Sequence, residues 1–177
     1  MKLLLTFFLF FPLTILSQEA LTLSEVIQVS NTDKNELFIR GREWFNNNFK
    51  SSKDVLQISD KETGELLGKG IMKVNYTWRY MGEKQSIIEV SFQMNIWVKD
   101  NRYKYELTNF NTIEDGMNIN FGLITISNET NVKYSGFNEK KLNEMYLSIK
   151  QGTITKANQL IKDLKHKMEQ ESSSSDW

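Results

Sequence analysis

Apolar and polar residues alternate between residues 66 and 108, and this alternation constrains the fold more than any other feature of the chain. The clearest segment is 87–98, in which every second residue is apolar. Side chains of a β-strand point alternately to opposite faces, so a period of two predicts strands with one buried and one polar face. Turn-forming residues at 81–84 and 100–101 separate the segments. The stretch therefore predicts an antiparallel sheet that is covered on one face.

Residues 35–49 have the different period of an amphipathic helix. Their large apolar side chains fall on one face, whereas Arg40 and Glu43 belong to the polar face. The polar side chains of residues 31–33 precede this helix and supply candidate N-cap oxygens. We expect the helix to cover the apolar face of the sheet.

Three glycines mark the expected contact between helix and sheet. Gly41 lies on the apolar helix face, and Gly68 and Gly70 are alternate residues of the strand that follows a hairpin at 55–64. A residue without a side chain lets two elements approach closely. A phosphate-binding loop is the alternative, but these glycines lie within a strand and no helix begins after them. Close packing is the preferred interpretation.

The last predicted helix spans residues 137–170. Asn138 supplies an N-cap oxygen, and the apolar stripe continues through the second half of the helix. A continuous helix would span about 48 Å, which is longer than a small sheet can cover, and Gly152 is a candidate break or kink. We expect residues 153–170 either to pack back on the convex side of their own domain or to form a homodimer with a second copy.

The N-terminus predicts export. Lys2 precedes an apolar run at 3–16, and small and polar residues follow, as is typical of a secretory signal peptide. The run of about 14 residues is shorter than the ~20 that a transmembrane helix needs. Cleavage after Ser17 and cleavage after Ala20 both fit. The sequence contains no cysteine, so we expect a soluble periplasmic or secreted protein that is not a lipoprotein.

These patterns divide the chain into four parts. Residues 1–17 are a signal peptide, 18–136 an α+β domain, 137–170 the C-terminal helix, and 171–177 a disordered tail. A short strand is expected at 25–30, and the segment 111–136 shows only one candidate extra strand, at 121–127. The predicted order is β-α-β-β-β-β-α.

Charge and residue content exclude several functions. The chain has 22 Lys and Arg and 22 Asp and Glu residues, a balance that argues against binding to nucleic acid or to an anionic bilayer. The only histidine, His166, lies among lysines on the polar side of the last helix, and with no cysteine a nucleophilic triad or zinc site is not expected. Asp60, Glu62 and Glu65 could bind calcium, but a charged turn is preferred because their spacing is not that of an EF-hand. We expect no cofactor and no metal.

Three segments carry a family resemblance. They are WFNNNF, DKETGELLGKG and VKDNRYKYELTNF. In this order they resemble a bacterial domain of unknown function that has a TATA-binding-protein-like fold and is found in exported proteins. The resemblance covers residues 24–110, and it implies a curved antiparallel sheet that holds helices on one face. It supplies no catalytic residue.

Two classes of function follow. The first is a non-enzymatic binding module of the bacterial cell envelope, whose partner is a protein, an envelope polymer or a small apolar ligand. Trp97 is a candidate platform because its ring lies on the polar sheet face, where Ile71 is expected beside it, although a simple packing pair would give the same pattern. Lys73 and Gln93 complete the candidate ligand-binding set.

The alternative is a carboxylate-dependent hydrolase of the periplasm. The sequence offers no pair of carboxylates that clearly converge on one point. DNA binding by analogy with the namesake of the fold is not expected, because fold alone does not carry function and because charge and export argue against it. The binding module is the preferred prediction.

Overall fold

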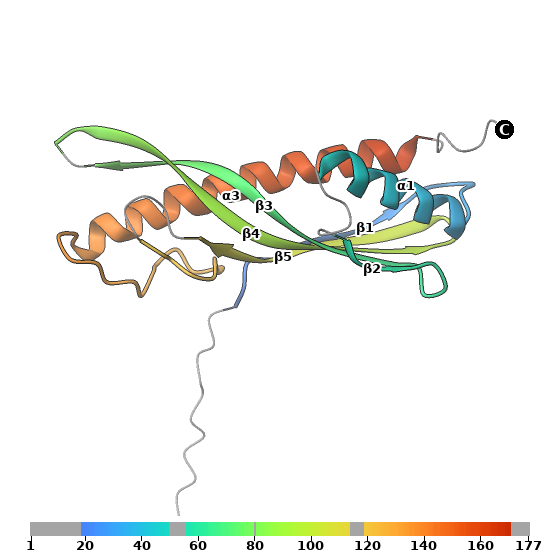
Figure 1. Ribbon diagram of the computed structural model, residues 1–177, viewed down its shortest axis with the longest axis horizontal. Coiled ribbons are helices and arrows are strands. Elements are labelled where there is room, and N and C mark those ends of the chain that lie inside the picture. Colours follow the sequence, from blue (N-terminus) through green and yellow to red (C-terminus); the bar gives the residue numbers. More distant parts are fainter. Residues whose placement is uncertain (1–18, 50–55, 80, 114–118, 171–177) are drawn as a thin grey trace, which may run out of the picture.

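The computed structural model describes residues 19–49, 56–79, 81–113 and 119–170 (Figure 1). The elements are β1 (Leu23–Gln28), α1 (Lys34–Asn48), β2 (Leu56–Asp60), β3 (Glu65–Arg79), β4 (Glu83–Lys99), β5 (Arg102–Thr112) and α3 (Glu139–Glu169). This order confirms the predicted α+β succession. The predicted signal peptide and the predicted C-terminal tail lie outside the described residues. Neither helix of the described part is both long and apolar enough to cross a membrane.

The strands form one antiparallel sheet with the order β1-β5-β4-β3-β2. Tight turns join the strands where the sequence predicts them, with Gly64 at φ 77° and Asn101 at φ 63°. Both helices lie on the same side of the sheet (Figure 1). The opposite side is therefore the face that the helices leave uncovered.

Alternation along the strands builds the core between the sheet and the helices. Every second residue from Ile88 to Val98 is almost fully buried, as the period of two predicts. The helices contribute the other half of the core, which includes Leu37, Phe38, Trp44 and Phe45 of α1 and Met145, Ile149, Ala157, Ile161 and Leu164 of α3.

Capping side chains begin both helices at the predicted places. The Asp33 carboxylate accepts the backbone N–H of Glu36 at 2.8 Å, and the Asn138 amide oxygen accepts that of Lys141 at 2.9 Å. Each bond satisfies a backbone donor that has no partner within its own helix. These local signals therefore place the first turns of α1 and α3.

The predicted glycine contact between α1 and β3 is confirmed. A Cβ atom on Gly41 would lie 2.7 Å from Cδ1 of Leu66, and one on Gly70 would lie 2.7 Å from Cε1 of Phe49. Gly68 is buried as well, opposite Met94 of β4. Helix and sheet approach closely at Gly41 and Gly70 because these two positions carry no side chain.

The prediction that α3 outreaches the sheet is wrong. The helix has 31 residues and spans about 46 Å, whereas the 17 residues of β4 span about 58 Å. The stripe that begins at Ala157 is buried against the chain's own sheet and α1, with Leu160 partly buried. The stripe is thus used within one chain, on the face that α1 also covers.

Gly152 does not interrupt α3. A Cβ atom at this position would lie 2.5 Å from Cγ1 of Val74 and 3.0 Å from the carbonyl oxygen of Asn75, so the glycine allows the helix to cross β3 closely. The helical hydrogen bonds continue through it because packing on the sheet supports the helix on both sides.

Arg40 is buried, contrary to its predicted place on the polar side of α1. Its side chain is 5% exposed, and Nη1 donates to the carbonyl oxygen of Met168 at 2.7 Å while Nε pairs with Glu36 at 2.8 Å. Lys167 and Glu43 form a second contact at 2.6 Å. The end of α3 covers this side of α1, and the arginine satisfies one of its terminal carbonyl groups.

Segment 119–137 does not contain the predicted strand at 121–127. Two isolated bridges replace it, Ala20 with Thr125 and Asn111 with Leu123. Gly122 has φ 67°, which turns the chain before a continuous ladder can form. The strand prediction is therefore wrong. The segment instead bridges Ala20, which precedes β1, and Asn111, near the end of β5.

Lys150 of α3 holds this segment in place. Its ammonium group donates to the carbonyl oxygens of Ile126 and Ser127 at 2.7 and 2.9 Å and to the amide oxygen of Asn128 at 3.1 Å. Burial lowers the pKa of Lys150. The three acceptors together offset the cost of burying the ammonium group.

The end of α3 is tied to β1 through Glu25. Its carboxylate accepts hydrogen bonds from Lys165 at 2.6 Å and from the hydroxyl of Tyr105 at 2.8 Å. The bond from Lys165, followed by that from Tyr105, lowers the pKa of Glu25. An edge strand and the last turns of the C-terminal helix thereby share one polar contact.

We expect Gly70→Leu to destabilise the protein by about 1–3 kcal/mol, because the new side chain overlaps the rings of Phe49 and Phe92. The matched control is Lys69→Leu, which places the same side chain on the uncovered face of the same strand and should stay within about 0.5 kcal/mol of the parent. Urea denaturation measures both. Equal stability of the two variants would contradict the contact.

Lys150→Met should cost about 1–3 kcal/mol, because three part-buried hydrogen bonds to the ammonium group are lost. Hydrogen exchange should become faster in residues 119–137 while α1 keeps its protection. Lys156→Met on the exposed side of α3 serves as the control and should leave both measurements unchanged. Unaltered exchange in Lys150→Met would show that other contacts hold the segment.

Glu25→Gln should lower the melting temperature at pH 7. A carboxyl group whose pKa is lower in the folded state stabilises the fold above its unfolded pKa, and this contribution is lost as the pH falls through the folded value. The difference between variant and parent should therefore shrink progressively below about pH 4.3. Glu144→Gln, at an exposed position of α3, is the control. A difference that is constant between neutral and acidic pH would refute the assignment.

Candidate functional site

The open face is the side of the sheet that faces away from α1 and α3. Its side chains include Glu65, Leu67, Lys69, Ile71 and Lys73 of β3; Ile87, Glu89, Ser91, Gln93, Asn95, Trp97 and Lys99 of β4; Arg102, Lys104, Glu106 and Thr108 of β5; and Ser24 and Val26 of β1. Most are polar and at least partly exposed. This is the polar face that the alternation predicts.

All members of the predicted ligand-binding set lie on the open face, but they do not form one cluster. Trp97 is opposite Glu65, whereas Ile71 is opposite Ser91. Ser91 and Trp97 are about 20 Å apart along β4. The prediction that Ile71 lies beside Trp97 is therefore wrong, because the register of β3 against β4 separates them.

The other two predicted residues fall between and beyond these positions. Gln93 lies between Ser91 and Trp97 on β4. Lys73 is opposite Glu89 and forms an exposed ion pair with it at 3.9 Å, beyond Ile71. The predicted set thus contains two separate surfaces, one around Trp97 and one around Ile71.

A hollow of about 380 Å³ adjoins Trp97. Its lining residues are Val26, Trp97, Lys99, Arg102, Tyr103 and Lys104. We call this the Trp97 hollow. The ring of Trp97 is partly exposed, and Val26 retains 55% of its surface, so the lining offers apolar area to solvent. The hollow spans β1, β5 and β4, which bring together residues that are distant in sequence.

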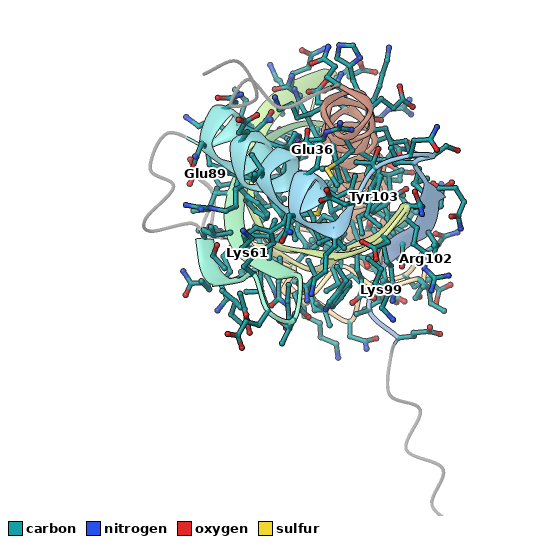
Figure 2. All side chains as sticks on the ribbon, turned by 90° about the vertical axis from the view of Figure 1, so that its right-hand side faces the viewer. Glu36, Lys61, Glu89, Lys99, Arg102 and Tyr103 are labelled. Atoms are coloured by element: carbon teal, nitrogen blue, oxygen red, sulfur yellow. The ribbon has the colours of Figure 1, made fainter. Side chains whose placement is uncertain are left out.

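Three cationic residues line the Trp97 hollow. The ammonium group of Lys104 lies 5.0 Å from the centre of the Trp97 ring, within range of a cation–π interaction. Lys99 and Arg102 are opposite each other at the end of β4 and β5, and Figure 2 shows them together at this end of the sheet. Burial raises the pKa of Tyr103, whose side chain belongs to the core. The charged groups of the hollow are thus the three cations.

A row of amide side chains continues from the hollow along β4 and β5. The Gln93 amide donates to the oxygen of Asn95 at 3.0 Å, and Asn109 donates to Gln93 at 3.5 Å. Each amide carries two donor hydrogens and an oxygen with two acceptor positions. The row therefore combines donors and acceptors on the open face.

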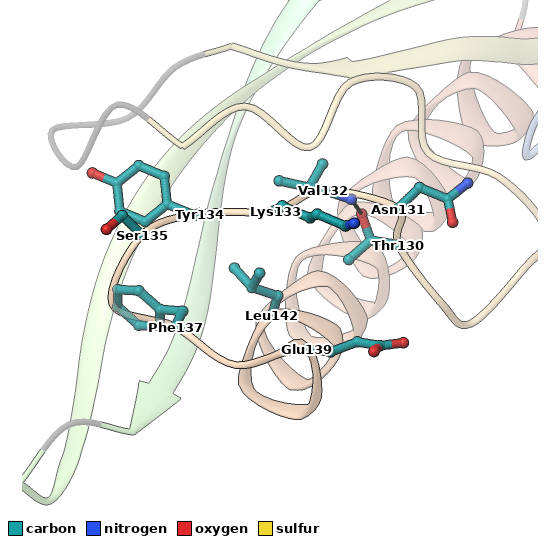
Figure 3. A pocket seen from close by; sticks show the side chains of 9 residues that line it. All are labelled: Thr130, Asn131, Val132, Lys133, Tyr134, Ser135, Phe137, Glu139 and Leu142. Carbon is teal, nitrogen blue, oxygen red and sulfur yellow. Dashed lines mark hydrogen bonds between the residues drawn. The ribbon is translucent and has the colours of Figure 1, made fainter.

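A second hollow lies between segment 119–137 and the first turns of α3 (Figure 3). It measures about 790 Å³, and its lining residues are Thr130, Asn131, Val132, Lys133, Tyr134, Ser135, Phe137, Glu139 and Leu142. A neighbouring space of about 340 Å³ shares residues 130–132 and reaches Tyr146. Sequence reasoning missed both spaces because residues 111–136 show no periodic pattern.

The remaining sequence candidates have ordinary surroundings. His166 is exposed and contacts Gln170 within its own helix at 2.9 Å. The Asp60 carboxylate accepts hydrogen bonds from Thr63 and from the backbone N–H of Glu62, which lower the pKa of Asp60 and close the β2–β3 turn. Within the described ranges, no group of three or more His, Cys, Asp or Glu residues is arranged to hold a metal ion.

Comparison with known proteins gives the fold but no ligand. Solved structures with a similar fold include a TBP-like protein from Parabacteroides distasonis, with 16% identity and TM-score 0.62, where the match covers 86% of this chain and 95% of that one. They also include a DUF4468 family protein from Bacteroides ovatus, with 15% identity and TM-score 0.62, where the match covers 87% of this chain and 89% of that one. At such identities the likeness concerns the fold alone. No curated protein matches the sequence.

A family model provides the assignment. The model described as "Domain of unknown function (DUF4468) with TBP-like fold" matches residues 24–112, which include nearly all of β1 and every element from α1 to β5. The match covers half of the chain and contains the residues of the open face. The chain therefore belongs to the DUF4468 family of domains of unknown function with a TBP-like fold.

Proposed function

We propose that this protein is an exported, non-enzymatic binding module that recognises a polymer of the bacterial cell envelope on its open face, around Trp97. The observation that carries the proposal is the position of this ring. Trp97 lies partly exposed on a mostly polar face, directly beside a hollow, instead of in the core. An exposed aromatic ring with polar groups around it is a common arrangement in binding surfaces.

Export is supported by the N-terminal sequence. The apolar run at 3–16 after Lys2 has the length and the flanking residues of a signal peptide. The absence of cysteine from the sequence leaves no acceptor for a lipoprotein anchor. Export would bring the module to the envelope polymers that we propose as ligands.

The Trp97 end of the open face is favoured over the alternatives that the sequence raised. The apolar stripe of α3 is buried in its own chain and offers no continuous surface to a partner. Ile71 is 60% exposed, but it stands between Lys69 and Lys73 as an isolated apolar side chain. Trp97 has the larger ring and an adjoining hollow.

The proposed role is binding instead of hydrolysis because of the groups that line this hollow. Carboxylate-dependent glycoside hydrolysis uses two acidic groups on either side of the bond that is cleaved. The lining of the Trp97 hollow contains no carboxylate among the described residues. Glu106, on the same face, is paired with Lys104 at 3.3 Å. The polar groups here suit recognition.

Trp97→Ala should weaken polymer binding by about tenfold or more while the fold persists, because the ring lies outside the core. The probes are polygalacturonate and laminarin, an acidic and a neutral polysaccharide, each titrated by calorimetry. Ile71→Ala, at the other end of the same face, is the control and should bind like the parent. Circular dichroism and thermal melting verify folding. If Trp97→Ala binds as well as the parent, or if neither polymer binds, the proposal is refuted.

A further inference from the structure

We infer that the polymer bound at Trp97 is an acidic polysaccharide, whose carboxylate groups pair with Lys99, Arg102 and Lys104 while a sugar ring stacks on the indole. This inference rests on the proposed function and adds the chemical class of the ligand. It follows from the charge of the hollow, from the neighbours of each cation and from the polar groups that continue along the face.

Two of the three cations have no carboxylate partner in the part of the chain that the structure describes. No ion pair joins Lys99 or Arg102 to a carboxylate of the described residues. Asp100 lies between them in sequence, but its carboxylate binds the start of α1. It accepts the backbone N–H of Lys34 at a distance of 2.9 Å. The positive charge of this corner is therefore available to a ligand.

The nearby acidic groups of the open face lie on one side of the hollow only. Glu106 pairs with Lys104, and Glu65 faces Trp97 from β3. Lys99 and Arg102 lie at the opposite side, toward the β4–β5 turn (Figure 2). A ligand that carries negative charge is thus attracted to the turn side of the ring. In a chain of balanced charge, this corner is a local feature and not part of a generally basic surface.

The Trp97 ring and the neighbouring amide side chains favour a sugar over other anionic ligands. A sugar ring has a flat C–H face that can stack on the Trp97 indole, and its hydroxyl groups can exchange hydrogen bonds with the accessible amides of Gln93 and Asn109. Asn95 is only 7% exposed, and its amide oxygen accepts a hydrogen bond from Gln93, which holds the Gln93 amide in position. From Trp97 to Gln93 the face extends about 14 Å, enough for more than one consecutive sugar ring.

Other anionic polymers fit this surface less well. Nucleic acids bind through many phosphate contacts and need an extended basic surface, which a chain with equal numbers of acidic and basic residues does not provide. Exposed ion pairs are individually weak and are screened by salt. The affinity therefore depends on stacking and on repeated groups along one chain, as a polysaccharide offers.

The test compares one sugar backbone in two charge states. Polygalacturonate and its fully methyl-esterified form share the same rings, but only the first carries carboxylates. The parent should bind polygalacturonate at least tenfold more tightly than the ester, and binding should weaken several-fold between about 50 and about 300 mM NaCl.

A matched pair of variants locates the charge effect. Lys99→Gln/Arg102→Gln should lower affinity for polygalacturonate at least tenfold. Lys73→Gln/Arg79→Gln removes the same net charge from the part of β3 beyond Ile71, away from Gln93, and should change affinity less than twofold. All four substitutions are at exposed positions, and thermal melting verifies that both variants fold as the parent does.

The outcomes separate this inference from the proposed function. If acid and ester bind alike and Trp97→Ala abolishes binding of both, the inference is overturned while the proposed function stands. If both double variants lose affinity equally, the cations act only through overall charge, and the inference is again overturned. Tighter binding of polyglutamate than of polygalacturonate would assign the hollow to acidic peptides and overturn it as well. If no polysaccharide binds, both proposals fail.

Discussion

The close crossing of α3 over β3 is the contact on which the architecture depends. At Gly152 there is no room for a Cβ atom beside Val74, so helix and strand approach as closely as their backbones allow. From this point the helix continues along the sheet in both directions, and α1 covers the remaining part of the same face (Figure 1). Two helices therefore bury one face of a five-stranded sheet, and the other face is left to solvent.

Polar contacts join the elements that apolar packing brings together. Arg40 satisfies a terminal carbonyl group of α3, Lys165 reaches Glu25 on the edge strand, and Lys150 gathers the carbonyl groups of segment 119–137. All three use long cationic side chains to bridge elements that are distant in sequence. These cations therefore stabilise contacts within the fold. Lys99 and Arg102 at the β4–β5 turn form no ion pair with a carboxylate among the described residues.

Because both helices cover one face of the sheet, few surfaces are left on which the protein can bind a ligand. The stripe of α3, which would otherwise invite a partner, is used inside the chain. The open face carries one large ring beside a hollow, an arrangement that suits a chain-like ligand lying across strands better than an enclosed small molecule. The second hollow, behind segment 119–137, is larger, but its lining mixes single acidic and basic groups with rings and selects no particular ligand class.

The sequence by itself determined the local features: the strand faces through alternation, the helix starts through Asp33 and Asn138, and the glycine contact at Gly70. It could not fix the register of β3 on β4, because a slip of two residues keeps every side chain on its face, and this register separates Ile71 from Trp97. The buried state of Arg40, the continuity of α3 and the path of segment 119–137 were likewise decided only by the tertiary structure. Each depends on which element, distant in sequence, packs alongside. Neither hydrophobic periodicity nor a capping residue specifies that element.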